Sequence, residues 1–236
     1  MIRKQEVFEV DIPGAVEHAL ETLEDEFRNE PTLFFTEHDL VSKAYQLIQQ
    51  ELGEAKVCGA DGKIHYLVHH EYPTPFRCDM SGKGFVIKDE IDRTPRGSKY
   101  QRGHYDLVIF NPDYLKRCEY ELAKGQNYKK LKLKLSEIID ATGAAAIVVG
   151  IEFMFNRDNF SSVSSIENWW AGVMQDYQKL LASKSWHGRP FMDKAIMMAF
   201  DASSQAGRHV QVKEDLSSHS EIQYCSPQGT GSASRA

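Results

Sequence analysis

The chain has 236 residues, of which 42% are hydrophobic and 11% aromatic, ordinary values for a globular protein that buries a real core. No window is long and apolar enough to span a bilayer, and the first residues lack the apolar core of a secretory signal, so we expect a cytoplasmic protein without membrane contact. The net charge of −6 neither favours nor excludes a nucleic-acid partner.

The acidity of the chain lies at its N-terminus. Residues 1–30 carry nine acidic and three basic side chains, whereas the other 206 residues carry 25 of each. Within this segment, apolar residues from Val16 to Phe27 recur at helical spacing, which predicts an amphipathic helix over residues 14–28. We expect an acidic helical segment at 1–30, followed by the main domain.

The first helix of the main domain is predicted from Thr36 to Gly53. Thr36 and Asp39 form a capping-box-like pair, and Gly53 fits a C-cap. Glu37 lies in the first turn on the buried face, where it either stabilises the positive end of the helix dipole or serves a site.

Three β-branched and aromatic runs predict strands at 64–71, 104–110 and 146–153, the first of them ended by Tyr72–Pro75. We expect these strands to form an antiparallel meander. A helix that begins at Ser165 then leads to a fourth strand at 195–200, which implies a crossover and a parallel pair.

A lysine-rich insertion separates the second and third strands. Residues 113–143 carry seven lysine or arginine side chains, and we predict a helix that ends near Gly143. The alternation in Leu131–Leu135 also fits a strand. From residue 202 the chain is rich in Ser, Gly and Gln, so we expect a main domain at 31–201 and a disordered tail at 202–236.

Basic residues also lead into the second strand. Arg93, Arg96, Lys99 and Arg102 follow one another without an acid after Asp92. Such a run is usually a solvated face, but its position favours contact of Arg96, Lys99 and Arg102 with phosphate.

Two predicted strands each carry one carboxylate in an apolar run, Asp106 and Glu152. A buried carboxylate is costly unless it is paired, hydrogen-bonded or bound to a metal. Two of them on neighbouring strands therefore indicate a cation site. Glu71 is the candidate third ligand from the first strand, Glu37 is the alternative from the helix, and a structural role for either is equally open.

The order helix-strand-strand-strand-helix-strand, with Asp106 on the second strand and Glu152-Phe153-Met154 on the third, resembles the PD-(D/E)XK superfamily of restriction-endonuclease-like nucleases. The resemblance covers residues 36–200. It implies an α/β fold with an αβββαβ core, in which helices flank a central mixed sheet. It also implies a Mg²⁺- or Mn²⁺-dependent nuclease with a nucleic acid, above all DNA, as partner; the ions neutralise the phosphate and activate water.

Met154 stands where the superfamily motif has a lysine, and a thioether has neither charge nor proton. Some members supply this lysine from the following helix, where Lys179 is the candidate. Asp176 and His104 would support the site, although Asp176 and Lys179 also fit a simple ion pair. Otherwise the protein is an inactive nuclease-fold relative that binds nucleic acid or protein. The oligomeric state is open, a homodimer included.

A zinc-dependent hydrolase is a third hypothesis, based on His69, His70 or His104. The sequence has no His-Glu-x-x-His spacing, and its four cysteines are scattered without a Cys-x-x-Cys pair. We therefore rank this hypothesis below the other two.

Overall fold

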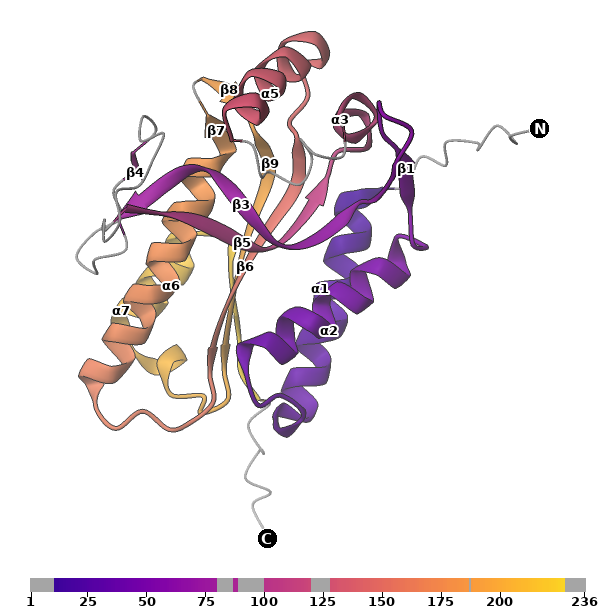
Figure 1. Ribbon diagram of the computed structural model, residues 1–236. Helices are drawn as coiled ribbons and strands as arrows, with labels where there is room; N and C mark the ends of the chain where they lie inside the picture. Colours follow the sequence, from indigo (N-terminus) through magenta and orange to yellow (C-terminus); the bar gives the residue numbers. More distant parts are fainter. Residues whose placement is uncertain (1–10, 80–86, 89–99, 120–127, 187, 228–236) are drawn as a thin grey trace, which may run out of the picture.

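The structure is a computed structural model that describes residues 11–79, 87–88, 100–119, 128–186 and 188–227. It is a mixed α/β protein in which helices flank a six-stranded sheet of order β10-β9-β6-β5-β3-β4 (Figure 1). The strands of this sheet are β3 (Val68–Asp79), β4 (Ile87–Lys88), β5 (Tyr100–Phe110), β6 (Ile147–Asn156), β9 (Met192–Asp201) and β10 (Ile222–Cys225).

The described helices are α1 (Ile12–Asn29), α2 (Glu37–Glu51), α3 (Pro112–Arg117), α5 (Tyr128–Thr142), α6 (Val163–Lys184) and α7 (Val210–Ser218), with short 3-10 turns η1 (Pro31–Leu33) and η2 (Ala206–Arg208). Two hairpins are separate from the main sheet, β1 (Lys56–Cys58) with β2 (Ile64–Tyr66) and β7 (Ser185–Trp186) with β8 (Arg189–Pro190). No helix in the described ranges combines the length and the apolar character needed to cross a membrane.

The strand directions follow the predicted meander and crossover. The strands β3 and β5 are antiparallel, as are β5 and β6, whereas β6 and β9 are parallel and connected through α6. The strand β10 adds a further parallel pair at the outer side of β9. This order places the ends of β5 and β6 next to α6.

Helices cover the sheet on both sides (Figure 1). On one side, α1 inserts Phe27 edge-on against Phe155 of β6 and Phe200 of β9. On the other side, α6 packs against β6, with Leu180 at an ordinary contact distance of 3.6 Å from a Cβ built at Gly150. The predicted acidic helix is therefore formed by α1, and its apolar stripe is part of the common core.

The helix ends agree with local sequence, with one correction. Thr36 and Asp39 form the predicted capping box at the start of α2. The helix α6 begins earlier than expected, because Ser162 is its N-cap and Ser165 is the third residue of the capping box. In the insertion, Leu131–Leu135 are part of the helix α5 and not of a strand. The helix ends just before Gly143, whose φ of +67° is a conformation that favours glycine.

The prediction that Tyr72–Pro75 ends the first strand is wrong. Residues 64–66 belong to the β1–β2 hairpin, and β3 continues through both prolines to Asp79. The ladder between β3 and β5 shifts register between Pro73 and Arg77, which accommodates residues without a backbone N–H.

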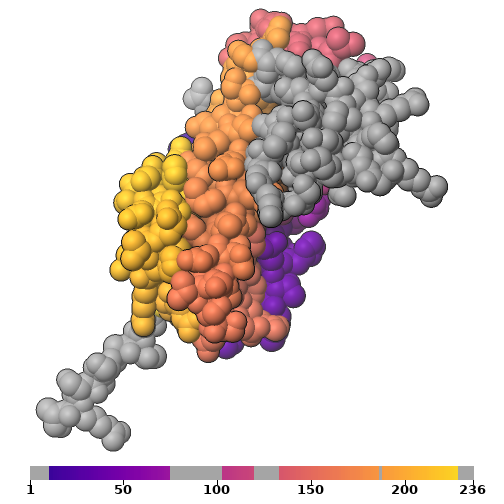
Figure 2. All heavy atoms as spheres, turned by 90° about the vertical axis from the view of Figure 1, so that its left-hand side faces the viewer, coloured from indigo at the N-terminus to yellow at the C-terminus, as the bar shows by residue number. Residues whose placement is uncertain are grey.

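The prediction of a disordered tail from residue 202 is wrong for residues 202–227. This stretch forms η2, α7 and β10, and Figure 2 shows it, in yellow, lying along α6. Trp170 Nε1 of α6 donates to Asp215 Oδ2 of α7 over 2.7 Å, and Tyr177 Oη donates to Glu221 Oε2 over 3.1 Å. These contacts and the pairing of β10 with β9 outweigh the polar composition.

Candidate functional site

The candidate site lies where β5 separates from β6. The two strands pair directly as far as Leu107 opposite Ile151, and beyond this point β5 bends away together with β3 (Figure 1). Backbone N–H groups of β6 that lose a strand partner there need another acceptor. Two carboxylates supply it.

Asp106 and Glu37 bind neighbouring N–H groups of β6. Asp106 Oδ2 accepts from the Phe153 N–H over 2.7 Å, and Glu37 Oε2 accepts from the Phe155 N–H over 3.2 Å. The N-terminus of α2 is thereby joined to β6, and the two carboxylates lie along one stretch of the strand. Sequence reasoning left Glu37 open between the helix dipole and a site, and the structure adds a contact with a strand 118 residues away.

Lys179 of α6 enters the same site. Its Nζ lies 2.7 Å from Glu152 Oε1 and 3.2 Å from Asp176 Oδ1, and it donates to the His104 carbonyl oxygen over 2.9 Å. Glu152 is only 2% exposed. Its contact with Lys179 is therefore a largely buried ion pair.

The carboxylates of the site hold protons more tightly than usual. Burial raises the pKa of Glu37 to about 7, with repulsion from Asp106 as the next cause. Burial also raises the pKa of Asp106 to about 6 and that of Glu152 well above its usual value. For Lys179, burial acts to lower the pKa, but Glu152 and Asp176 outweigh it and the pKa is raised. The site therefore gathers buried carboxyl groups whose charged forms are costly unless a cation lies beside them.

The donor chemistry of the site fits a divalent cation. Mg²⁺ and Mn²⁺ prefer carboxylate oxygens, and a cation would relieve the desolvated charge on Asp106 and Glu152. Within the described ranges, however, no three His, Cys, Asp or Glu side chains surround a common metal position. The carboxylates instead face backbone N–H groups and the Lys179 ammonium.

Glu71 lies beside Asp106. Its neighbours His70 and Tyr72 pair with Leu107 and Tyr105, and its charge contributes to the raised pKa of Asp106. Glu71 is exposed and has a φ of +48°, a left-handed conformation that is unusual for a residue with a side chain. The strand thus holds this carboxylate at the edge of the site.

The histidines of the zinc hypothesis take separate positions. His69 Nε2 lies 2.9 Å from the Tyr66 carbonyl oxygen, and the His70 ring packs against Tyr45 at a tilt of 30° with centroids 4.2 Å apart. His104 is exposed and contributes its carbonyl oxygen to the site. Of the predicted phosphate contacts, Arg96 and Lys99 lie outside the described residues, and Arg102 is described only as part of β5.

Met154 lies on β6 close to α6. It is half-buried on β6, two residues after Glu152, and a Cβ added to Gly172 of α6 would lie 3.1 Å from Met154 Cε. The thioether therefore packs against the helix from which Lys179 reaches Glu152.

Sequence reasoning missed the backbone groups of the site. The N–H groups of Phe153 and Phe155 and the carbonyl of His104 hold Asp106, Glu37 and Lys179 in place. No side-chain pattern marks such groups, because they depend on where the strands separate.

Comparison of the chain with protein-family models, with curated proteins and with solved structures finds no match.

Proposed function

We propose that this chain is a divalent-metal-dependent nuclease of the PD-(D/E)XK type that hydrolyses phosphodiester bonds in DNA. The observation that carries the proposal is the 2.7 Å contact between Lys179 Nζ and Glu152 Oε1. It places an ammonium from α6 beside the strand carboxylate, although position 154 has no charge. Asp106 and Glu37 lie at the same place, where β5 separates from β6.

The restriction-endonuclease-like fold is part of this proposal. The helix α2, the antiparallel strands β3, β5 and β6, the crossover helix α6 and the parallel strand β9 follow the order of an αβββαβ core. In this assignment α1, α3, α5 and the segment from η2 to β10 are additions to the core. A fold alone does not define an activity, so the side chains of the site must carry the argument.

Each residue of the site has a role in the proposed reaction. Asp106 and Glu152 would hold Mg²⁺ or Mn²⁺, with Glu37 or Glu71 as a third carboxylate. The metal would neutralise the scissile phosphate and supply an activated water. Lys179 offsets negative charge on the phosphate and orients the water, while Asp176 and the His104 carbonyl position its ammonium.

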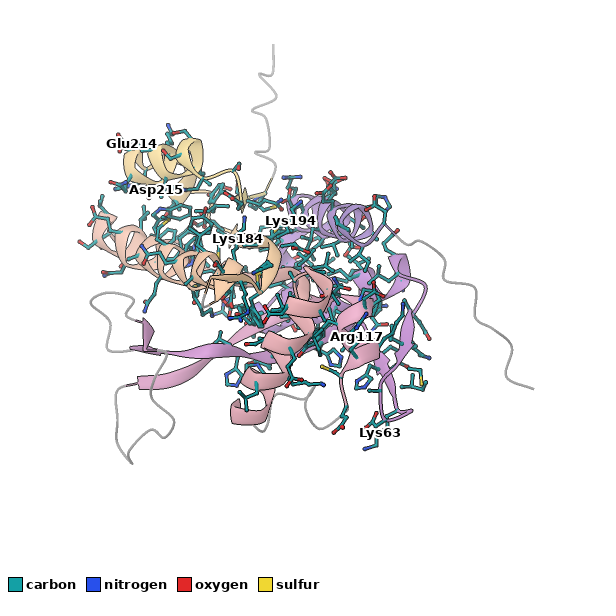
Figure 3. The ribbon with its side chains drawn as sticks, turned by 90° about the horizontal axis from the view of Figure 1, so that it is seen from above. Lys63, Arg117, Lys184, Lys194, Glu214 and Asp215 are labelled. Carbon is teal, nitrogen blue, oxygen red and sulfur yellow. The ribbon has the colours of Figure 1, made fainter. Side chains whose placement is uncertain are left out.

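The proposal is tested by DNA cleavage with matched variants. We expect plasmid or linear DNA to be hydrolysed in Mn²⁺ or Mg²⁺, and Asp106→Asn, Glu152→Gln and Lys179→Met each to lower the rate by about a hundredfold or more. Glu214→Gln is the control, because Glu214 is an exposed carboxylate of α7 (Figure 3). Cleavage at the wild-type rate by Asp106→Asn or Glu152→Gln would contradict the proposal.

Met154 favours a second candidate function, a catalytically inactive nuclease-fold protein that binds nucleic acid or protein. This candidate predicts no thermal shift with Mg²⁺, because a ligand that binds only the native state stabilises it by mass action. It also predicts that Met154→Lys leaves the protein inert. A metal-dependent shift or any metal-dependent cleavage by the wild type removes it.

A further inference from the structure

Lys179 is the cation of the site in the absence of metal. Among the described residues it is the basic side chain that lowers the pKa of Glu37, Asp106 and Glu152 alike, and it pairs with Asp176 as well. Its side chain is 11% exposed, so the ammonium has exchanged water for protein acceptors. One positive charge thus faces four carboxylates.

We propose that Lys179 is the counter-cation of the metal-free site, and that a divalent cation displaces its ammonium from Glu152. The inference rests on the proposed function, because it takes the same carboxylates to bind the metal. Lys179 would thereby be freed for the substrate only when the metal is bound. Metal binding and the availability of the lysine would be one coupled event.

The geometry supports this exchange in two ways. The three acceptors around Nζ match its three protons, so the ammonium must leave one of them before it can contact a phosphate or a water. Of the three contacts, the one to the His104 carbonyl at 2.9 Å is a hydrogen bond to the backbone, which a metal held by carboxylates would leave in place. Glu152 is the contact that opens in this proposal because Glu152 is one of the proposed metal ligands, and the lysine stays in the site through His104 and Asp176.

Competition between two cations makes an unusual prediction for a mutation. If Lys179 opposes metal binding, Lys179→Met should bind Mn²⁺ more tightly than the wild type, by about tenfold or more, even though it loses activity. The measurement is titration of the metal-free full chain with Mn²⁺ alone, by calorimetry or thermal shift. Lys184→Met is the control. Lys184 is the last residue of the same helix (Figure 3), and its charge affects the pKa of Glu221, which is not a carboxylate of the candidate site. Equal or weaker binding by Lys179→Met would overturn the inference.

A measurement on the wild type keeps the inference testable if Lys179→Met does not fold. Lysine acetylation by a small amine-reactive reagent, read by mass spectrometry, reports the accessibility of each ammonium. We expect Mn²⁺ to raise the modification of Lys179 several-fold and to leave Lys184 unchanged. Unchanged or stronger protection of Lys179 in saturating Mn²⁺ would overturn the displacement.

The failure of this inference differs from the failure of the proposed function. Tighter Mn²⁺ binding by Lys179→Met, without DNA hydrolysis by the wild type, supports the exchange and contradicts the nuclease. Hydrolysis by the wild type together with weaker Mn²⁺ binding by Lys179→Met supports the nuclease and contradicts the exchange. Absence of Mn²⁺ binding by both proteins contradicts both.

Discussion

The Phe153 N–H donates a hydrogen bond of 2.7 Å to Asp106 Oδ2 at the point where the pairing of β5 with β6 ends. One carboxylate therefore has two roles, since it completes the hydrogen bonding of a strand and contributes charge to the candidate site. The two roles can be separated by substitution, because the first needs only an oxygen acceptor and the second needs a negative charge.

Asp106→Asn keeps an acceptor for the Phe153 N–H, whereas Asp106→Leu removes it. In the presence of a chelator at neutral pH, we expect Asp106→Asn to have a free energy of unfolding equal to or above that of the wild type, because a desolvated charge is lost. Asp106→Leu should lose about 1–3 kcal/mol relative to Asp106→Asn, since a buried N–H is left without a partner. Urea denaturation measures both, and equal stability of the two variants would show that this hydrogen bond contributes little.

Glu37 couples the stability of the metal-free protein to pH. Its pKa is raised to about 7, chiefly by burial, so the folded protein binds this proton more tightly than the unfolded chain. The stabilisation is fully present below the usual carboxyl pKa and is lost as the pH rises through about 7. We expect the free energy of unfolding of the wild type, relative to Glu37→Gln, to fall by about 1–3 kcal/mol between about pH 4.5 and about pH 8.

Chemical denaturation of the wild type and Glu37→Gln over this pH range checks the prediction. Glu214→Gln serves as the exposed carboxylate control and should follow the wild type. Parallel pH profiles for the wild type and Glu37→Gln would mean that Glu37 titrates alike in the folded and unfolded chains.

Part of the candidate site has local signals in the sequence. A lone acid in an apolar strand marks Asp106 and Glu152, and helical spacing marks the position of Asp176 and Lys179 on α6. Glu37 was an alternative third ligand, and its contact with Phe155 was not predicted, because this contact depends on how α2 packs against a strand 118 residues away. Tertiary distances of this kind have no signature in a single sequence.

The segment after residue 201 shows how composition misleads. The segment is polar and rich in serine. It is nevertheless ordered by Asp201, the fully buried last residue of β9, whose carboxylate accepts from the N–H groups of Ser203 and Ala206 in the turn that follows. Short elements such as β10, with four residues, carry too few apolar side chains for a periodic pattern. The fold there depends on specific hydrogen bonds, which composition does not reveal.

Asp201 should therefore be essential for the C-terminal part of the sheet. Its carboxylate accepts hydrogen bonds from several groups, including Tyr224 Oη at 2.8 Å and the Ala206 N–H at 2.9 Å. We expect Asp201→Ala to lower the free energy of unfolding by about 3–5 kcal/mol and Tyr224→Phe by about 1–2 kcal/mol. Asp158→Ala, at an exposed position, should change it little, and thermal or urea denaturation of the three variants is the measurement. A small effect of Asp201→Ala would contradict the structural role.

The position of the lysine can be tested by moving it. Met154 lies two positions after Glu152 on β6, so their side chains lie on the same side of the strand. Met154 is half-buried and packs near Gly172, which leaves room for an unbranched side chain of similar length to reach the site. We expect Lys179→Met to be inactive and the double variant Met154→Lys/Lys179→Met to recover a measurable part of the cleavage rate.

The recovery should be specific for a charge at this position. Met154→Gln in the Lys179→Met background is the control, because it is polar and of similar size but carries no ammonium. DNA cleavage in Mn²⁺ is the measurement, and circular dichroism establishes that each variant is folded. Equal rates for the lysine and glutamine double variants would show that an ammonium at 154 cannot replace Lys179. Recovery by lysine alone would mean that the site needs an ammonium beside Glu152 and accepts it from either β6 or α6.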